Sequence, residues 1–467
     1  MKNIKQNLVY NIAYQLLIIL TPLVTTPYIS RTLGPENIGT YSYYYSIVFY
    51  FGMFILLGLN NYGNRNIAYK KNNKSKMSKE FLTIYTLQII LFILMSLLYI
   101  LFIVYFAENK LMASLQFIYL ISVGLDINWF YFGLEEFKLT VTRNMFIKIL
   151  SVILILIFVN NESDIYIYTI IMLGSTLLSQ IILFYFLKKY IVWEPFTIKD
   201  VLKHIKPNLV LFIPVIMISI YNLTGKIMLG ILSTLTEVGI YESSSKLTAI
   251  PLALITAIGT VMLPRASAMV SSGRINESRV YLNISLFLAI TASSALSFGI
   301  ISVVEIITKI FFGPGFEKTI QVIPILIISS IFISWGNVVR TQYLIPEKRD
   351  NIYLKSVFLG AVFNVSVNLF LVQKFNSVGV AIGALVAEII VATYQTVAIR
   401  KDVNLYKSLL ISVPMILNGI VMMIIVRSIN LNLNIIYLLI IKIIVGTTFF
   451  GLIFLLYFSF LKKKKLV

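Results

Sequence analysis

The chain has 467 residues, of which 58% are hydrophobic and only 12% are charged, yet its formal net charge is +20. Soluble domains carry about 25% charged residues and fewer apolar ones, so this balance excludes a soluble nucleic-acid-binding protein. Cysteine is absent, which excludes disulfides and thiolate metal sites, and the single histidine, His204, argues against a multi-histidine metal site.

Apolar stretches between polar or charged clusters predict an all-α polytopic membrane protein. About fourteen transmembrane helices are expected, because each span needs about 20 apolar residues. The expected spans, in chain order, cover residues 8–30, 40–62, 81–106, 112–134, 145–160, 165–187, 208–231, 238–263, 281–304, 320–344, 355–373, 378–399, 408–426 and 435–461.

Basic residues in the connecting segments orient these spans. With the N-terminus inside, most of the 39 Lys and Arg residues fall in inside segments, such as residues 63–80, 188–207 and the terminal run Lys462–Lys465. The outside segments hold few, among them Lys110 and Arg427. Cytoplasmic loops carry this excess of Lys and Arg in membrane proteins, so both termini are predicted to be cytoplasmic.

Two parts of the chain resemble each other in order and spacing. Gly39 and Tyr41, after the first predicted span, correspond to Gly239 and Tyr241, after the seventh. Six spans separate the two copies, and six is even, so both halves would have the same orientation, as in transporters built from parallel repeats. The alternative is chance similarity between apolar, low-complexity segments.

The repeat predicts how the chain is divided. We expect two six-helix lobes joined by a cytoplasmic linker, followed by two extra helices with a basic tail. The expected parts are the first lobe at residues 1–187, the linker at 188–207, the second lobe at 208–399 and the extra helices at 400–467.

Four basic residues lie within the predicted spans or at their edges, namely Arg31, Lys226, Lys246 and Arg340. A charge near the bilayer centre costs about 2.5–3.5 kcal/mol by insertion scales, so such groups face a cavity or a partner. Together they suit an anionic substrate such as a phosphate or diphosphate. The alternatives are neutralisation of Lys246 by Glu242, at i,i+4 spacing, and snorkelling of Arg31 and Arg340 to the headgroups.

Three other charged residues lie within predicted spans. Asp126 and Glu388 have no basic residue within one helical turn, so each either binds the proton or cation that drives transport or bonds to a basic residue of a neighbouring helix. Lys442, in the outer third of the last span, is expected to snorkel toward the membrane surface.

Three motifs resemble those of bacterial Wzx-type polysaccharide flippases, in the superfamily that also holds multidrug exporters and lipid II flippases. The first is Tyr28–Ser42, with Gly34, Pro35, Gly39 and Tyr41. The second is Asp126–Lys138, with Trp129, Gly133 and Glu135, and the third is Lys226–Gly230 followed by Val238–Tyr241 and Lys246. The resemblance covers essentially the whole chain.

The resemblance implies a V-shaped, two-lobed bundle in the bacterial cytoplasmic membrane that works by alternating access. It would be a transporter, not an enzyme, that moves an undecaprenyl-diphosphate-linked oligosaccharide to the outer leaflet. The resemblance further implies no bound cofactor, leaves H⁺ or Na⁺ as the coupling ion, and places the lipid tail in a groove of the last two spans. Its partners would be membrane lipids, a polymerase and other polysaccharide-assembly proteins, with no nucleic acid.

Two other functions stay open. A drug or cation antiporter of the same superfamily would favour an acidic cavity, whereas the charges within these spans are slightly positive on balance. A membrane-embedded polysaccharide polymerase would favour a long external loop or external carboxylates for acid–base chemistry, and the external segments here are short.

Overall fold

The structure, a computed structural model, describes the backbone of residues 2–464 and most of their side chains; those of residues 2–16, 18–19, 222, 254, 257–258 and 260–261 are outside the description. Within this part of the chain every regular element is a helix, which confirms the all-α prediction. Lys465, the last residue of the basic terminal run, lies outside the described residues.

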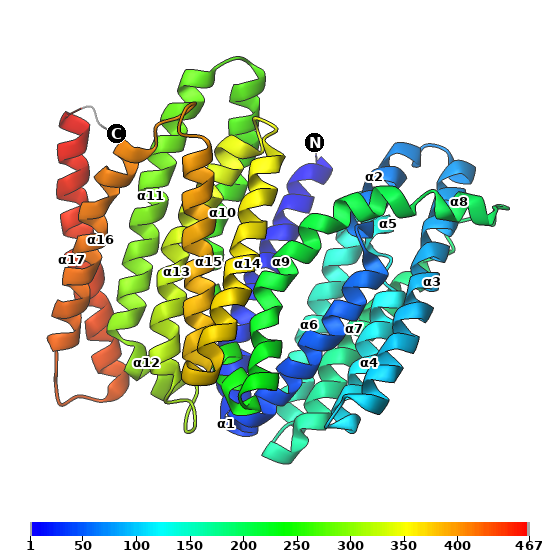
Figure 1. Cartoon of the computed structure of the whole chain (residues 1–467), viewed down its shortest axis with the longest axis horizontal. Helices are drawn as coiled ribbons and strands as arrows, with labels where there is room; N and C mark the ends of the chain where they lie inside the picture. Colours follow the sequence, from blue (N-terminus) through cyan, green and yellow to red (C-terminus); the bar gives the residue numbers. More distant parts are fainter. Residues whose placement is uncertain (1, 465–467) are drawn as a thin grey trace. The chain divides into compact units, whose positions relative to one another are not determined.

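The chain forms two compact units, Met1–Gly230 and Ile231–Val467. The first unit runs from blue to green in Figure 1. Its elements are α1 (Lys2–Leu56), α2 (Leu59–Lys70), α3 (Lys74–Tyr105), α4 (Lys110–Gly124), α5 (Asn128–Gly133), α6 (Phe137–Phe158), the 3₁₀ turn η1 (Glu162–Asp164), α7 (Ile165–Leu187), α8 (Ile198–Leu202) and α9 (Ile205–Leu232).

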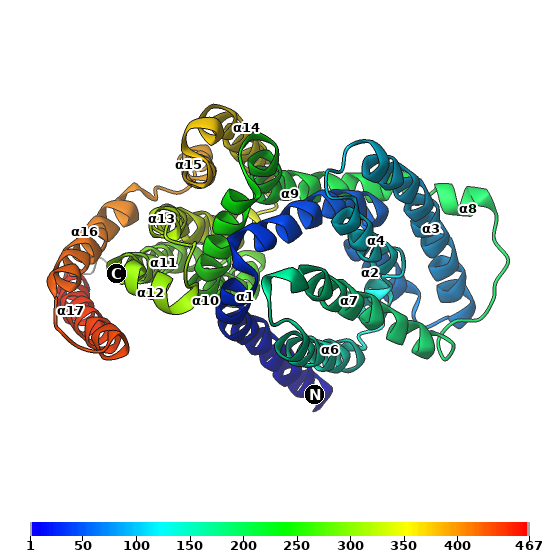
Figure 2. The same cartoon turned by 90° about the horizontal axis from the view of Figure 1, so that it is seen from below.

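The second unit continues from green to red. Its last two helices lie side by side at the C-terminal end in both views (Figures 1 and 2). Its elements are α10 (Leu235–Ser271), α11 (Ile275–Ser302), α12 (Val304–Phe311), α13 (Thr319–Val339), the π-helix η2 (Arg340–Leu344), α14 (Asp350–Phe375), α15 (Ser377–Ala398), α16 (Tyr406–Ser428) and α17 (Ile435–Lys463).

The first two predicted spans both lie on α1, which turns back on itself at Gly34 (Figure 1). Gly34 has φ 72° and ψ 171°, a conformation that a side chain strongly disfavours, and Pro35 follows it at once. The Gly-Pro pair of the first motif is therefore the physical cause of this turn.

Twelve segments of the described chain are long and apolar enough to cross a membrane. All fourteen predicted spans nevertheless lie on helices: two of them share α1, and span 238–263 lies on α10, which is outside the twelve. The membrane fold is thus confirmed, and the count of fourteen crossings stays a prediction.

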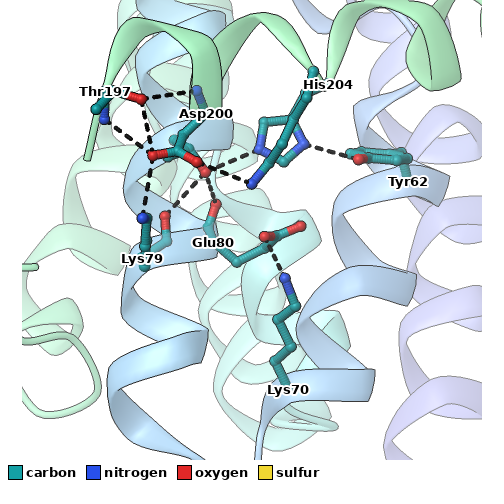
Figure 3. Close-up of polar contacts among 9 residues, drawn as sticks. Tyr62, Lys70, Lys79, Glu80, Thr197, Asp200 and His204 are labelled. Carbon is teal, nitrogen blue, oxygen red and sulfur yellow. Dashed lines mark hydrogen bonds and ion pairs between the residues drawn. The ribbon is translucent and has the colours of Figure 1, made fainter. Parts of the chain in front are cut away.

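The predicted linker, residues 188–207, is attached to the first unit by its second half (Figure 3). The His204 ring is fully buried, with Nδ1 2.8 Å from the Tyr62 hydroxyl and Nε2 2.9 Å from Thr83 Oγ1. Asp200, in α8, forms an ion pair with Lys79 of α3 at 3.1 Å. These contacts hold α8 and the start of α9 against α2 and α3.

The boundary between the units falls at Gly230, after the predicted linker, because α9 packs on α1. The Tyr50 hydroxyl lies 2.9 Å from Thr224 Oγ1. At Gly230 the helices are so close that an added Cβ would lie 2.1 Å from the ring of Tyr43. The sequence analysis assigned α9 to the second lobe as its first helix. In the structure α9 packs with the first unit.

The predicted repeat has a counterpart in the contacts of the two turns that precede Gly39 and Gly239. Asn37 Nδ2 donates to the carbonyl oxygen of Glu162, in the turn between α6 and α7, at 2.9 Å. Glu237 accepts from the backbone N–H of Ser377, in the turn between α14 and α15, at 3.1 Å. Asn37 and Glu237, at equivalent positions of the predicted repeat, thus each contact the connection of a helical hairpin in their own unit, α6–α7 in the first and α14–α15 in the second, as expected for two copies of one plan.

Candidate functional site

The four predicted substrate-binding cations are divided equally between the units. Arg31 and Lys226 lie on α1 and α9 of the first unit, and Lys246 and Arg340 lie on α10 and η2 of the second. Arg31, Lys226 and Lys246 lie within the motifs named above, and Arg340 lies outside them. Each of the four has a different local environment.

Arg31 is exposed on α1, one turn before the bend at Gly34. The residues around it build the turn: the Tyr28 hydroxyl donates to the carbonyl oxygen of Val159 at 2.7 Å, and Tyr41 is buried edge-on against Tyr168 at 5.1 Å between ring centres. The first motif therefore has a structural part, and its basic residue stays accessible.

Lys226 lies on α9 between the two positions, Thr224 and Gly230, at which α9 contacts α1. Its neighbour Ile227 packs on the apolar cluster around Ile47 and Val48 of α1. Lys226 itself is half-buried.

Lys246 forms an ion pair with Glu242 at 3.2 Å, one helical turn earlier on α10. The i,i+4 pairing that the sequence suggested as an alternative is therefore confirmed. Because 38% of the Lys246 side chain remains exposed, the ammonium can bind a second anion without leaving this partner.

Arg340 opens the π-helix η2 and is held from two sides. Its Nη2 donates to Asn337 Oδ1 at 2.7 Å, and its guanidinium lies 5.5 Å from the centre of the Tyr353 ring. The Nε–H is buried without a hydrogen-bond partner. π-Helical turns are rare and recur at functional sites, so this arginine has both an unmet donor and an unusual backbone.

Lys246 and Arg340 lie at different depths along α10. Asn337, the partner of Arg340, donates to the carbonyl oxygen of Thr256 at 3.4 Å, so η2 lies level with that part of α10. Thr256 is ten residues after Lys246, or about 15 Å along the helix axis. The two cations therefore lie at separate levels along α10.

Asp126, a predicted ion-coupling residue, is part of a hydrogen-bond network at the end of α4. Its Oδ1 accepts from the backbone N–H of Asn128 at 2.9 Å and from the Asn128 amide at 2.6 Å. Asn128 Oδ1 in turn accepts from Arg143 Nη2 at 2.9 Å. The carboxylate therefore caps α5 and is linked to a basic residue of a neighbouring helix.

The remainder of the second motif closes one end of the first unit. Trp129 is fully buried and donates to Gln88 Oε1 at 3.1 Å. At Gly133 an added Cβ would lie 2.8 Å from the backbone oxygen of Asn64, so only glycine permits α5 to approach α2 this closely. Glu135 forms an ion pair with Lys71 at 3.0 Å. These contacts give the three residues a structural role.

Glu388, the second predicted ion-coupling residue, has a different environment. It lies on α15, which packs against α13 and α14, and only 8% of it is exposed. Among the described residues no ion pair or hydrogen bond reaches its carboxylate. A buried carboxylate without a protein partner is suited to bind a proton or a cation, because the charged form is otherwise unstable there.

Sequence reasoning did not find a polar pocket of about 460 Å³ beside α2 and α3, lined by Lys71, Lys74, Lys189, Glu136 and Tyr190 among others. Tyr190 donates to Glu136 at 2.9 Å. Burial, together with this carboxylate, raises the pKa of the Tyr190 hydroxyl to about 12, so the hydroxyl keeps its proton at neutral pH. The lining joins residues far apart in the chain, and no local pattern could have indicated it.

A second pocket, of about 410 Å³, is apolar and lies among α11, α12, α16 and α17. Lys442 is its charged lining residue and is only 7% exposed. Lys442 thus faces other helices, and the expectation that its side chain snorkels toward the membrane surface stays a prediction. Lys442 lies on the face of α17 that contacts other helices of the second unit. The sequence alone does not show which face of a C-terminal helix is buried.

Comparison with known proteins places the chain among proteins of polysaccharide assembly. The sequence pattern of the family described as "Polysaccharide biosynthesis protein" matches residues 4–270. A protein of Escherichia coli (strain K12), described as "Putative O-antigen transporter", is 24% identical over 86% of this chain and 97% of its own length. A protein of Shigella dysenteriae with the same description is 21% identical over 82% of this chain and 96% of its own.

Solved structures share the fold. The lipid II flippase MurJ in an inward closed conformation has a TM-score of 0.77 at 16% sequence identity, covering 99% of this chain and 100% of MurJ. An inward-facing multidrug resistance transporter of the MATE family has a TM-score of 0.60 at 15% identity, covering 82% of this chain and 94% of its own. At these identities the similarity establishes the fold.

Proposed function

Because the chain belongs to the family of polysaccharide biosynthesis proteins, we propose that it is a flippase that moves a lipid-linked oligosaccharide across the bacterial cytoplasmic membrane for surface polysaccharide assembly. The observation that carries the proposal is this membership combined with a fold that matches a lipid II flippase along the whole chain. The relatives named as O-antigen transporters support the same class of substrate. Because a transporter forms and breaks no covalent bond in its substrate, no residue is assigned a catalytic role.

The substrate that suits these four cations is an undecaprenyl-diphosphate-linked repeat unit. A diphosphate offers several oxygens to charge-assisted hydrogen bonds from Arg and Lys. Arg340, with its unmet Nε–H, and Lys246, about 15 Å away along α10, would contact it one after the other as it moves from the inner to the outer leaflet. Arg31 and Lys226 are the corresponding contacts proposed for the first unit, and alternating access would expose them in turn.

Glu388 is the group proposed to bind the coupling ion, either H⁺ or Na⁺. It is buried without a protein partner, whereas Asp126 is already engaged by Asn128. A carboxylate free of hydrogen bonds changes its protonation or ion occupancy at lower cost than one that caps a helix. No tightly bound cofactor is part of the proposal, and a polymerase is its proposed protein partner.

The test is transport of a fluorescent undecaprenyl-diphosphate oligosaccharide in proteoliposomes, read by quenching from outside. We expect the full chain to expose the label across the bilayer, and Arg340→Gln to reduce the rate by about tenfold, since one charge-assisted hydrogen bond is worth about 1.5–3 kcal/mol. Arg274→Gln, at an exposed position of the same unit, is the matched control and should keep the rate. No transport by the unaltered chain, or full transport by Arg340→Gln, contradicts the proposal.

A further inference from the structure

The apolar pocket beside the last two helices has the properties of a lipid-binding site. It lies wholly within the second unit, and its walls include Gly299 of α11, Ile307 of α12, Met422 of α16 and Gly446 of α17. Ile443, beside it on α17, is 52% exposed, so the pocket borders the apolar outer surface of the bundle. A hydrocarbon chain of the bilayer can therefore approach the pocket along the apolar side chain of Ile443.

Lys442 gives this pocket one positive charge. The side chain is more than nine-tenths buried, and among the described residues no hydrogen bond or ion pair reaches it. An ammonium in apolar surroundings is unstable unless an anion accompanies it, because the hydration it loses is not replaced. The ligand that suits this pocket therefore combines an anionic group, which pairs with Lys442, with a hydrocarbon chain, which fills the apolar space.

The depth of Lys442 matches the phosphate level of a leaflet. Helix α17 has 29 residues and is about 43 Å long, against about 30 Å for the hydrocarbon core, so each end extends past the core by about 6–7 Å. Lys442 is seven residues after Ile435, the first residue of α17, or about 10 Å along its axis. With α17 centred on the hydrocarbon core, Lys442 lies about 3–4 Å inside the boundary, a depth from which its long side chain can reach a lipid phosphate.

We propose that this pocket binds one anionic phospholipid of the surrounding membrane, with an acyl chain between α11, α16 and α17 and its phosphodiester against Lys442. A single ammonium balances the single charge of a phosphodiester, whereas a diphosphate carries more charge than this pocket can neutralise. The occupant is therefore a resident lipid of the bilayer, distinct from the transported molecule. This inference does not rest on the proposed transport function.

Native mass spectrometry of the purified full chain tests the proposal, with phosphatidylglycerol, phosphatidylethanolamine, undecaprenyl phosphate and inorganic phosphate as probes. We expect one phosphatidylglycerol to be retained, about tenfold more tightly than the net-neutral phosphatidylethanolamine, and Lys442→Gln to abolish this preference. Lys309→Gln, the same change at an exposed position of α12, is the matched control and should keep it.

A second variant keeps the charge and fills the space. An added Cβ at Gly299 would lie 3.8 Å from Met422 Cε, in ordinary contact, so Gly299→Leu should fold and lose phosphatidylglycerol while Lys442 remains. Equal retention of both phospholipids, or unchanged retention by Gly299→Leu or Lys442→Gln, overturns the proposal. Displacement by undecaprenyl phosphate at equal concentration would assign the pocket to a carrier lipid instead, and protection by inorganic phosphate alone would leave an ion site only.

Discussion

The two units treat their buried charges in opposite ways. Among the residues that the structure describes, four charged side chains are buried: Glu80 and Arg143 in the first unit, Glu388 and Lys442 in the second. Glu80 has Lys70 at 2.5 Å, and Arg143 donates to Asn128 and to the carbonyl oxygen of Ser179, both at 2.9 Å. Among the same described residues, no hydrogen bond or ion pair reaches Glu388 or Lys442.

This difference separates structural charges from charges kept for a ligand. A buried charge with full hydrogen bonding fixes neighbouring helices, and its removal leaves the partners unsatisfied. A buried charge without partners destabilises the fold by itself and is retained where something binds it. The first unit is expected to lose stability when its buried charges are changed, and the second to lose binding or coupling.

The largest loss of stability is expected for Arg143→Met. The substitution leaves Asn128 Oδ1 and the Ser179 carbonyl oxygen without donors in a buried place, which costs about 3 kcal/mol together. Thermal unfolding in detergent, followed by a dye-free fluorescence melt, measures the shift. Arg274→Met, at an exposed site, should shift the melt little, and equal shifts for the two variants would remove Arg143 from the structural group.

Glu80→Gln is expected to destabilise the first unit by about 1–2 kcal/mol. The neutral amide keeps the shape but loses the charge-assisted bond from Lys70, which is itself partly exposed and can turn to water. The melting temperature is the measurement, and Lys70→Met in the Glu80→Gln background should then add little. A large additional loss in the double variant would mean that the two residues act independently.

Asp126→Asn is expected to cost about 1 kcal/mol or less, since the amide oxygen can still accept from the backbone N–H of Asn128. Because Asp126 caps α5, its variant should also keep ion-dependent transport. Loss of ion dependence at normal stability would transfer the coupling role from Glu388 to Asp126, and would break the distinction between the units.

The smallest effect on stability is expected for Glu388→Gln, because no partner is lost; the melt should be unchanged or slightly higher. Transport in proteoliposomes should, in contrast, become independent of an imposed H⁺ or Na⁺ gradient. Glu305→Gln, an exposed carboxylate on α12, should keep the dependence. A Glu388→Gln variant that unfolds at lower temperature and keeps its ion dependence would place Glu388 with the structural charges.

Local sequence patterns predicted those parts of the site that depend on neighbours along the chain. The spacing of Glu242 and Lys246 indicated their ion pair. Gly34 and Pro35 were found as part of a motif, and the structure showed that they form the turn within α1. The partner of Asp126 could not be predicted beyond its residue type, because Arg143 reaches it through Asn128 from another helix. The burial of Lys442 among other helices could not be predicted for the same reason.

The sequence by itself determined that this is a helical membrane protein with two similar halves, because apolar length and the alternation of basic loops are properties of contiguous residues. Only the tertiary structure decided which charges have partners. In the folded chain, His204 attaches the linker to the first unit, and the side chain of Lys442 lines an apolar pocket. The physical reason is that the energy of a buried charge depends on atoms far away in the chain, which helix packing brings near or leaves out.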